Sequence, residues 1–239
     1  MKYTVTGGAG FIGSNLVDQL IADGHEVVVI DDLSIGDKAN INPKAKLILA
    51  DISEITKSQI ITDVAMEGMA GSDAVFHLAA KARVQPSIEN PIEFNKTNVD
   101  GTLNMLILTR DAGIKRFVYS ASSSAYGNAS KFPTPEDHPT DPLSPYGLQK
   151  LIGEQYCKVF SHCYDLETVC LRYFNVFGER QSLSGAYCLV MGIFIQQRLE
   201  DKQMTIVGDG EQRRDFTYVG DVVKANILAA QSEKVGFGE

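Results

Sequence analysis

Tyr146 and Lys150 are the residues whose types and spacing most directly suggest chemistry. Four positions apart on a helix, two side chains lie on one face, a single turn from each other. An ammonium beside a phenol favours the phenolate, so we expect the pKa of Tyr146, about 10 for a free tyrosine, to fall far enough for general-base work near neutral pH. In isolation such a pair is more often a surface pair without a role.

A run of serine hydroxyls, from position 120 to 124, ends the apolar segment that precedes this pair. Hydroxyls at the end of a strand favour a catalytic interpretation of Tyr146 and Lys150. A serine run can also be a plain polar turn, and that is our expectation for Ser120 and Ser124.

A glycine-rich segment near the start of the chain predicts a nucleotide site. Gly7, Gly10 and Gly13 follow a short β-branched run at residues 3–6 and lead into residues 11–23, whose apolar positions recur at helical spacing. In such a strand, turn and helix, the first glycine allows the turn, the second a close approach to a pyrophosphate, and the third close packing of the helix.

Asp31 ends the next predicted strand, residues 26–30. A carboxylate there accepts hydrogen bonds from both ribose hydroxyls and repels a 2′-phosphate, which favours NAD over NADP. Alone, the glycines could be only a turn and Asp31 only a solvated loop acid. Their joint placement in one βαβ unit favours dinucleotide binding.

Composition bounds the protein class. The 239 residues are 44% hydrophobic and 22% charged, typical of a globular protein, and a formal charge of −8 argues against a nucleic-acid or anionic-membrane partner. No apolar stretch approaches eighteen residues, and the N-terminus enters a strand without a basic leader, so we expect a cytoplasmic protein. The cysteines and histidines lack metal-ligand spacing, so no metal is expected.

Strand-like runs alternate with helical segments. Runs at 46–50, 74–78, 116–120 and 168–171 come after the first two strands, which predicts an α/β fold of Rossmann type, a doubly wound parallel sheet whose carboxyl ends bind ligand. Two long helices are expected at 91–111 and 145–162. We expect an NAD-binding domain at 1–175, and at 176–239 a smaller, apparently truncated C-terminal substrate-binding lobe with a segment that returns to the first domain.

With these motifs the chain resembles the extended short-chain dehydrogenase/reductases, and within them the nucleotide-sugar epimerases. The matching segments are residues 6–13, 31–34, 77–80, 144–146 with Lys150, 171–178, and 208–210 before 214–216. The resemblance implies a catalytic set of Ser122, Tyr146 and Lys150, and a UDP-sugar substrate contacted by Ser122, Ser123, Tyr146, Asn175 and Arg214. The residues that it implies for NAD are Gly7, Gly10, Phe11, Ile12, Gly13, Asp31, Asp32, Leu33, Ser34, Gly36, Asp51, Ile52, Leu78, Ala79, Ala80, Lys81, Thr97, Tyr146, Lys150 and Phe174.

The residues directly after Ser122 bear on the reaction. Family members that dehydrate or decarboxylate carry an acidic residue just after this hydroxyl, whereas residues 122–127 contain no Asp or Glu. The resemblance therefore favours 4-epimerisation: Tyr146 takes the proton of the 4-hydroxyl while C4 gives hydride to NAD⁺, and the 4-keto sugar rotates and receives the hydride on its other face. Residues 121–124, 143–146 and 185–187 look most like epimerases of UDP-N-acetylhexosamines.

Two alternatives stay open: another nucleotide-sugar dehydratase or reductase, and a catalytically silent NAD-binding protein. The two long helices carry apolar residues on more than one face, which together with the resemblance predicts a homodimer through these helices. Among these residues are Leu103, Leu106, Ile107, Leu151, Ile152 and Val159. Arg214 comes after a glycine turn and precedes a predicted strand at 215–218, so we expect its guanidinium to point over the cleft at the substrate diphosphate.

Overall fold

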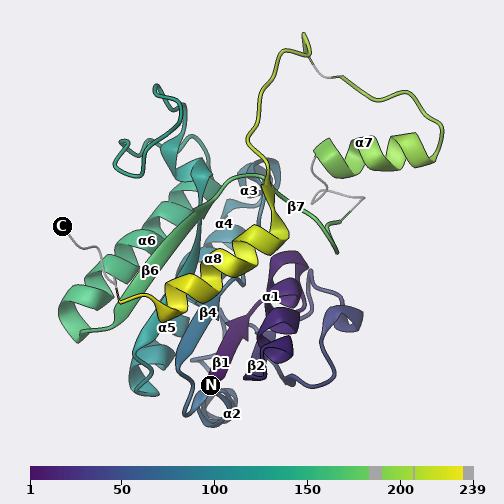
Figure 1. The fold of residues 1–239 in the computed structure, drawn as a ribbon. Helices are drawn as coiled ribbons and strands as arrows, with labels where there is room; N and C mark the ends of the chain where they lie inside the picture. Colours follow the sequence, from purple (N-terminus) through teal and green to yellow (C-terminus); the bar gives the residue numbers. More distant parts are fainter. Residues whose placement is uncertain (183–189, 207, 234–239) are drawn as a thin grey trace.

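A six-stranded parallel sheet organises the computed structural model, which describes residues 1–182, 190–206 and 208–233 (Figure 1). The strand order is β3-β2-β1-β4-β5-β6, so that the chain reverses direction across the sheet between β1 and β4. Neighbouring strands are parallel throughout. The strands are β1 (Lys2–Thr6), β2 (Glu26–Asp31), β3 (Lys46–Leu49), β4 (Ala74–His77), β5 (Arg116–Ser122) and β6 (Glu167–Tyr173).

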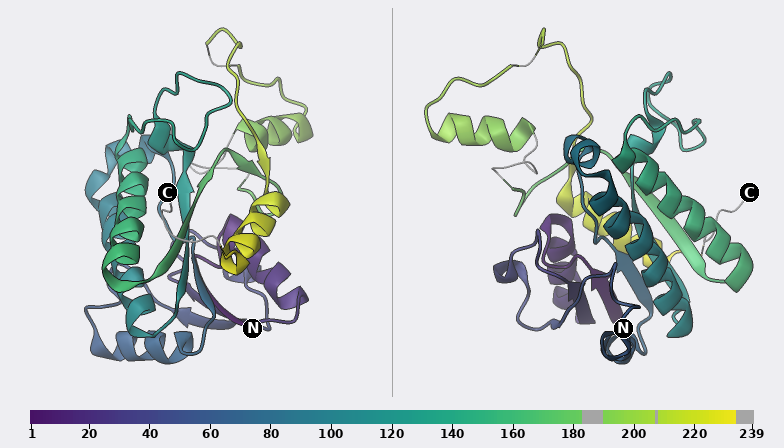
Figure 2. Two further views of the ribbon diagram at one scale, coloured as in Figure 1. Left: turned by 60° about the vertical axis from the view of Figure 1, so that its left-hand side comes forward. Right: turned by 180° about the vertical axis from the view of Figure 1, so that it is seen from behind.

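Helices cover both faces of this sheet, as the two turned views of Figure 2 show. On one face α1 (Phe11–Ala22) and α8 (Val219–Gln231) bury Leu16, Val17 and Val223 against β1 and β4. On the other face α2 (Gln59–Met69), α5 (Gly101–Asp111) and α6 (Pro145–Tyr164) form the larger core. The central strands are buried on both sides, which explains their nearly continuous apolar sequence and confirms the predicted doubly wound fold.

The predicted helix at 91–111 is divided in the structure. Helix α3 (Val84–Glu89) precedes α4 (Pro91–Asn95), and a π-helical turn, η2 (Lys96–Asp100), joins α4 to α5. The wider turn buries the Asn98 side chain, which binds the segment after β4. Periodicity alone did not predict this change, because a π-turn depends on tertiary contacts. Leu106, expected on an outer face, is fully buried in the core.

Helix α6 begins where the sequence predicts. Ser144 is its N-cap, with Oγ accepting a hydrogen bond from the amide of Gly147 (3.1 Å), and Pro145 occupies the first turn. The helix ends at Tyr164, two residues beyond the predicted end, and Asp165 comes next in the left-handed conformation. Short 3₁₀ turns occur at η1 (Lys38–Asn40) and at η3 (Ser123–Tyr126), directly after β5.

Beyond residue 175 the chain leaves the sheet and then returns to it. A two-stranded ladder joins β7 (Val176–Phe177) to β8 (Thr217–Tyr218), and between them α7 (Val190–Leu199) and the following segment extend away from the sheet (Figure 1). The predicted strand at 215–218 is therefore shorter than expected. Helix α8 brings the chain back onto the face of α1. In the described parts of the chain, no helix is long and apolar enough to cross a membrane.

Candidate active site

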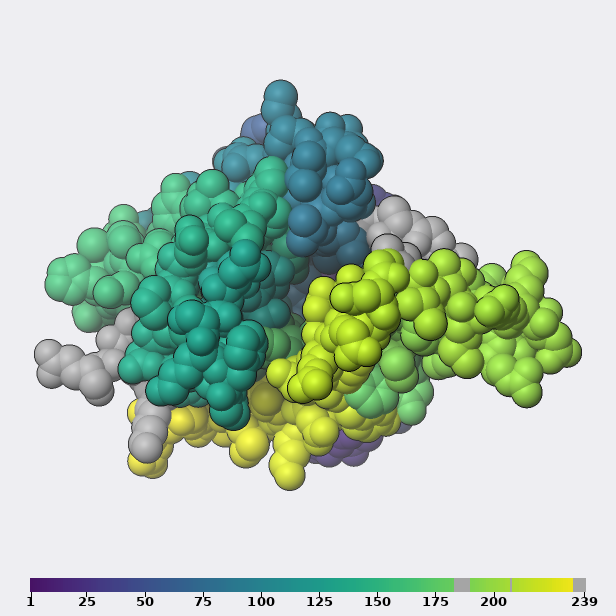
Figure 3. Space-filling view, turned by 90° about the horizontal axis from the view of Figure 1, so that it is seen from above, coloured from purple at the N-terminus to yellow at the C-terminus, as the bar shows by residue number. Residues whose placement is uncertain are grey.

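A cavity of about 600 Å³ lies at the carboxyl ends of the strands. Figure 3 looks down on this edge, where a recess separates the blue and teal part of the molecule from the yellow-green segment after α7. A parallel sheet binds ligands at this edge, where the direction of the connections reverses. Lining residues come from the ends of β1, β2, β4, β5 and β6 and from the start of α6.

The turn after β1 has the form of a phosphate cradle. Gly7 has φ +72°, and its amide donates to the carbonyl of Ile30 on the neighbouring strand (2.9 Å). A Cβ at Gly13 would lie 2.1 Å from the Gly7 carbonyl oxygen, so only glycine lets α1 approach the turn this closely. Gly10 caps α1, whose N-terminal amides face the cavity side of this turn. These features fit the pyrophosphate of a dinucleotide such as NAD.

Asp31 is the last residue of β2 rather than the first after it. One carboxyl oxygen accepts from the amide of Ala9 (2.9 Å) and the other from the amide of Leu33 (2.8 Å). Burial raises the pKa of Asp31, and these two hydrogen bonds oppose that rise. Each oxygen retains a lone pair, and Asp31 lines the cavity, so the carboxylate can still accept from ribose hydroxyls.

Most residues expected at the cofactor line the cavity. Three do not. Leu33 contributes a backbone amide to Asp31, Asp51 accepts from the amide and hydroxyl of Ser53, and Phe174 stacks on Tyr126. The expected residues that line the cavity are Gly7, Gly10, Phe11, Ile12, Gly13, Asp31, Asp32, Ser34, Gly36, Ile52, Leu78, Ala79, Ala80, Lys81, Thr97, Tyr146 and Lys150.

Tyr146 and Ser122 meet at the other end of the cavity. Ser122 is not part of the lining, but its side chain is near enough to lower the pKa of Tyr146, and its Oγ accepts from the amide of Ser124 (3.2 Å). Burial raises the pKa of Tyr146 above its ordinary value, while the Ser122 hydrogen bond and the charge of Arg83 lower it. The expected fall of this pKa towards neutrality is thus wrong for the protein without ligand, because burial is the largest effect.

Lys150 lies one turn along α6, as expected, with 4% of its surface exposed. Its Nζ donates to the carbonyl of Ser120 (2.8 Å) and lies 5.0 Å from the centre of the Tyr119 ring. Burial lowers the pKa of Lys150 to about 8.

A partly buried ion pair links β6 to α6 near the turn η3 that follows Ser122. Arg172 on β6 donates to both carboxylate oxygens of Glu154, one turn beyond Lys150 (2.9 and 2.6 Å). Its guanidinium also lies 4.5 Å from the ring centre of Tyr126, the last residue of η3. A bidentate pair of this kind is both strong and directional. It holds the turn that follows Ser122 against the helix that carries Tyr146.

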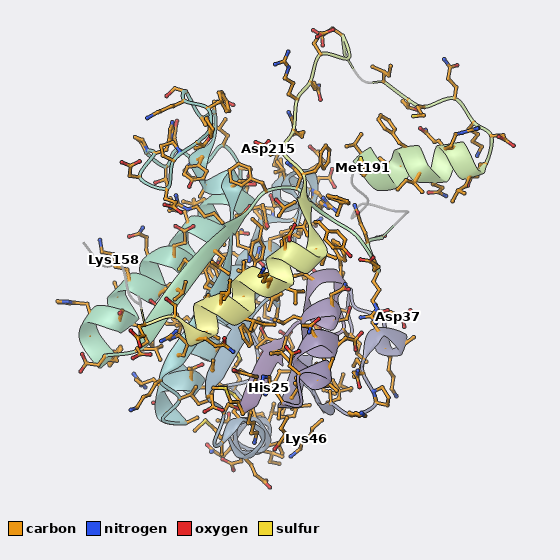
Figure 4. The ribbon with its side chains drawn as sticks, viewed as in Figure 1. His25, Asp37, Lys46, Lys158, Met191 and Asp215 are labelled. Carbon is orange, nitrogen blue, oxygen red and sulfur yellow. The ribbon has the colours of Figure 1, made fainter. Side chains whose placement is uncertain are left out.

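Besides Ser122, three other residues expected at the substrate lie outside the cavity lining. Ser123 begins η3, and Asn175 Nδ2 donates to the carbonyl of Asp215 (2.9 Å), which Figure 4 labels where the chain returns towards β8. Arg214 is exposed and donates to the carbonyl of Arg213 (2.7 Å). The expectation that its guanidinium points over the cleft is therefore corrected: every described residue from 201 to 216 is exposed, so no packing aims this side chain.

The structure also brings residues to the cavity that sequence reasoning missed. Ser120, expected in a polar turn, is a buried strand residue whose Oγ hydrogen-bonds the Tyr173 hydroxyl (3.1 Å). Tyr173 is in turn bonded to Asn226 of α8 (2.7 and 3.0 Å). The neighbouring motif residues at 174 and 175 were a signal for Tyr173, but nothing in the pattern pointed to Arg83 or Arg180, which also line the cavity.

Comparisons with known proteins agree with this geometry. Residues 3–238 match the family described as NAD dependent epimerase/dehydratase. A putative UDP-glucose 4-epimerase of Methanocaldococcus jannaschii is 45% identical over 226 residues, which cover 94% of this chain and 72% of that protein.

Two solved structures are similar over nearly the whole chain. UDP-N-acetylglucosamine 4-epimerase of Methanobrevibacter ruminantium, in complex with UDP-N-acetylmuramic acid, has a TM-score of 0.90 at 40% identity and covers 98% of this chain and 74% of its own. UDP-glucose 4-epimerase of Thermotoga maritima with UDP-glucose has a TM-score of 0.89 at 42% identity, with coverage of 96% and 73%. The chain therefore belongs to the NAD-dependent epimerase/dehydratase family of enzymes.

Proposed function

We propose that this protein epimerises a UDP-hexose at C4 through a transient 4-keto sugar. Residues 1–175 would bind NAD, and residues 176–239 would contribute to the substrate site. The chemistry that NAD supplies when bound is the reversible removal of hydride from the sugar carbon. The two similar structures are 4-epimerases of UDP-sugars, which supports this reaction class for the present chain.

The observation that carries the proposal is that, in the part of the chain that the structure describes, no carboxylate lines the end of the cavity at Tyr146. Among the described residues, the acids that line the cavity are Asp31, Asp32 and Asp37, and all three come from β2 or the loop after it. Elimination of water needs an acid near the reacting sugar in addition to the tyrosine. A site with a phenol and a serine hydroxyl at this end suits proton transfer at one hydroxyl, as in epimerisation.

Within this proposal the chain's own residues have separate tasks. Tyr146 removes the proton of the 4-hydroxyl and later returns it, and Ser122 donates a hydrogen bond that stabilises the charged form of the phenol. The amino group of Lys150 donates to the Ser120 carbonyl, which fixes its place in the cavity, and there it would hold the ribose of the cofactor. Burial excludes water from these groups, which protects the keto sugar from side reactions.

Two substrate classes fit this reaction: a UDP-hexose without an acetamido group and a UDP-N-acetylhexosamine. We propose a UDP-N-acetylhexosamine, which the sequence around Ser122 and the M. ruminantium structure both support. The test is to incubate the protein with UDP-galactose and with UDP-N-acetylgalactosamine in separate reactions and to identify the sugars by proton NMR. Faster formation of UDP-N-acetylglucosamine supports the proposal. Exclusive conversion of UDP-galactose would contradict the acetylated substrate but not the reaction.

We also propose that two copies of the chain pair through α4, α5 and α6. An apolar stripe runs along α6, with Leu148 and Val159 about half exposed and Ile152 between them. On α4, Ile92 is 85% exposed. Exposed apolar residues on two neighbouring helices are typical of a protein–protein interface.

A further inference from the structure

His77 ends β4 as a fully buried residue, and the proposed reaction gives it no task. The residues that follow it, 78–81, all line the cavity, and we call them the cavity segment. A buried imidazole requires a hydrogen-bond partner at each ring nitrogen, because an unpaired polar group in the interior costs free energy. Both partners of His77 also lead to the groups that hold the cavity segment, one at each end of it.

Thr6, the last residue of β1, supports the start of the cavity segment. Its Oγ1 accepts from the amide of Ala79 (3.2 Å) and lies 2.8 Å from His77 Nδ1. Gly7 comes next in the chain and begins the phosphate turn, where a Cβ would lie 2.7 Å from the amide nitrogen of Ala79. The cavity segment therefore packs directly on the phosphate turn, so a shift of one would displace the other.

Asn98 of η2 supports the end of the cavity segment. Its side chain accepts from the amide of Lys81 (2.8 Å) and donates to the Lys81 carbonyl (2.9 Å). The carbonyl of Asn98 accepts from Thr102 Oγ1 (2.7 Å), and this oxygen lies 3.0 Å from His77 Nε2. The imidazole thus connects the support at one end of the cavity segment to the support at the other.

The direction of each hydrogen bond follows from the hydrogens that each group carries. Thr102 gives its one hydroxyl hydrogen to the Asn98 carbonyl, so it can only accept from His77, whose Nε2 must carry a hydrogen. In a neutral imidazole Nδ1 is then the acceptor, and Thr6 donates to it. Burial, followed by the charge of Lys150, lowers the pKa of His77 to about 3, which agrees with a neutral ring.

We propose that His77, held as the Nε2–H tautomer, is a positioning residue that fixes the cavity segment for NAD binding. Its hydrogen bonds form a chain that runs in one direction, from the Ala79 amide to the Asn98 carbonyl. Removal of one hydroxyl from this chain leaves a buried donor or acceptor unpaired and loosens the connection between the two supports. The role rests on the proposed NAD-binding domain, and the nature of the sugar does not enter it.

Thr102→Val tests the chain, because it removes the acceptor of the His77 hydrogen with little change in volume. Thr109→Val is the matched control: Thr109 is also buried on α5 and donates to the carbonyl four positions earlier, that of Met105 (2.6 Å). Both variants lose a buried hydrogen bond, so both should unfold at a lower urea concentration than the wild type. Bound NAD should exchange for isotopically labelled NAD about tenfold faster in Thr102→Val, and at the wild-type rate in Thr109→Val, as measured by mass spectrometry.

NMR of protein with isotopically labelled histidine tests the tautomer itself. His77, whose signals are those lost in His77→Phe, should have a protonated Nε2 and a bare Nδ1 throughout the neutral pH range. His77→Asn, whose side-chain oxygen can accept from Thr6 in place of Nδ1, should exchange NAD more slowly than His77→Phe. A ring protonated on Nδ1, or equal NAD exchange in Thr102→Val and the wild type, would overturn the proposal. Neither result depends on turnover, so both are distinct from a failure of epimerisation.

Discussion

At the residue scale, the proposed chemistry depends on the protonation states of Tyr146 and Lys150, which both line the cavity. Tyr146 and Lys150 lie on one helix face because their spacing dictates it. Their pKa values depend instead on burial among elements distant in sequence, which raises the pKa of Tyr146 and lowers that of Lys150. Residue spacing does not report burial, which explains why the sequence predicted a fall in the pKa of Tyr146 where the structure has a rise.

Tyr146→Phe should abolish turnover while leaving bound NAD in place, because it removes the acid and base oxygen but little volume. We expect kcat to fall by at least about 10²-fold, the usual contribution of a general base. Steady-state rates and the nucleotide released from the denatured protein measure the two effects. A rate close to that of the wild type would mean that another group transfers the proton.

Lys150 also makes the stability of the protein depend on pH. Its pKa is about 8 in the folded chain against 10.5 when exposed, so between these values the unfolded chain binds more protons and stability rises with pH. Lys150→Met lacks this dependence. The wild type should therefore gain on the order of 3 kcal/mol relative to the variant as the pH rises from below 8 to above 10.5.

Urea unfolding of the nucleotide-free proteins across this pH range measures the difference. Lys158→Met changes an exposed lysine that projects outward from the same helix (Figure 4) and should follow the wild type. A constant difference between wild type and Lys150→Met at all pH values would show that the buried amino group does not titrate in this range.

At the element scale, hydrophobic periodicity predicted the six strands and the main helices to within a few residues, because buried parallel strands and amphipathic helices have clear patterns. It did not predict the π-turn at η2, where the Asn98 side chain forms hydrogen bonds with the backbone of Lys81, in the segment after β4. Nor did it predict the course of residues 201–216, whose described members are exposed and whose position no packing specifies.

This exposed segment after α7 should be the first part of the chain to be cut by a protease. Its backbone has few hydrogen bonds to the rest of the protein, and it contains Lys202, Arg213 and Arg214. Brief trypsin treatment followed by mass spectrometry should find cleavage after these residues before any cut within the sheet and its helices. Early cleavage after Lys150 or Lys158 of α6 instead would contradict the arrangement.

At the scale of the whole molecule, one edge of the sheet carries the proposed site and one pair of helical surfaces carries the proposed interface. The cavity lies where the strands of the sheet end. A doubly wound parallel sheet places all its carboxyl ends at one edge, so the fold itself brings these strand ends together. The location of the site could therefore be predicted from the fold. The fine position of each side chain depended on the contacts between helices.

Dimerisation should depend on the apolar stripe of α6. The double variant Ile152→Glu, Val159→Glu places two charges in the proposed interface. Light scattering should therefore find it monomeric at concentrations where the wild type is a dimer. Lys46→Glu, on the β3 edge of the sheet away from α6, is the control and should leave the dimer intact (Figure 4). A wild type that is monomeric at all micromolar concentrations would reject the interface.

The most direct test of the central claim is a product analysis without added nucleotide. The purified protein, with only its own NAD, is incubated with a large excess of a UDP-hexose, and the sugar is analysed by proton NMR and mass spectrometry. Epimerisation at C4 predicts many turnovers per protein molecule, an inverted C4 configuration, an unchanged sugar mass and an unchanged NAD content. Conversion that stops after one equivalent per protein, or a product lighter by one water, would contradict the account.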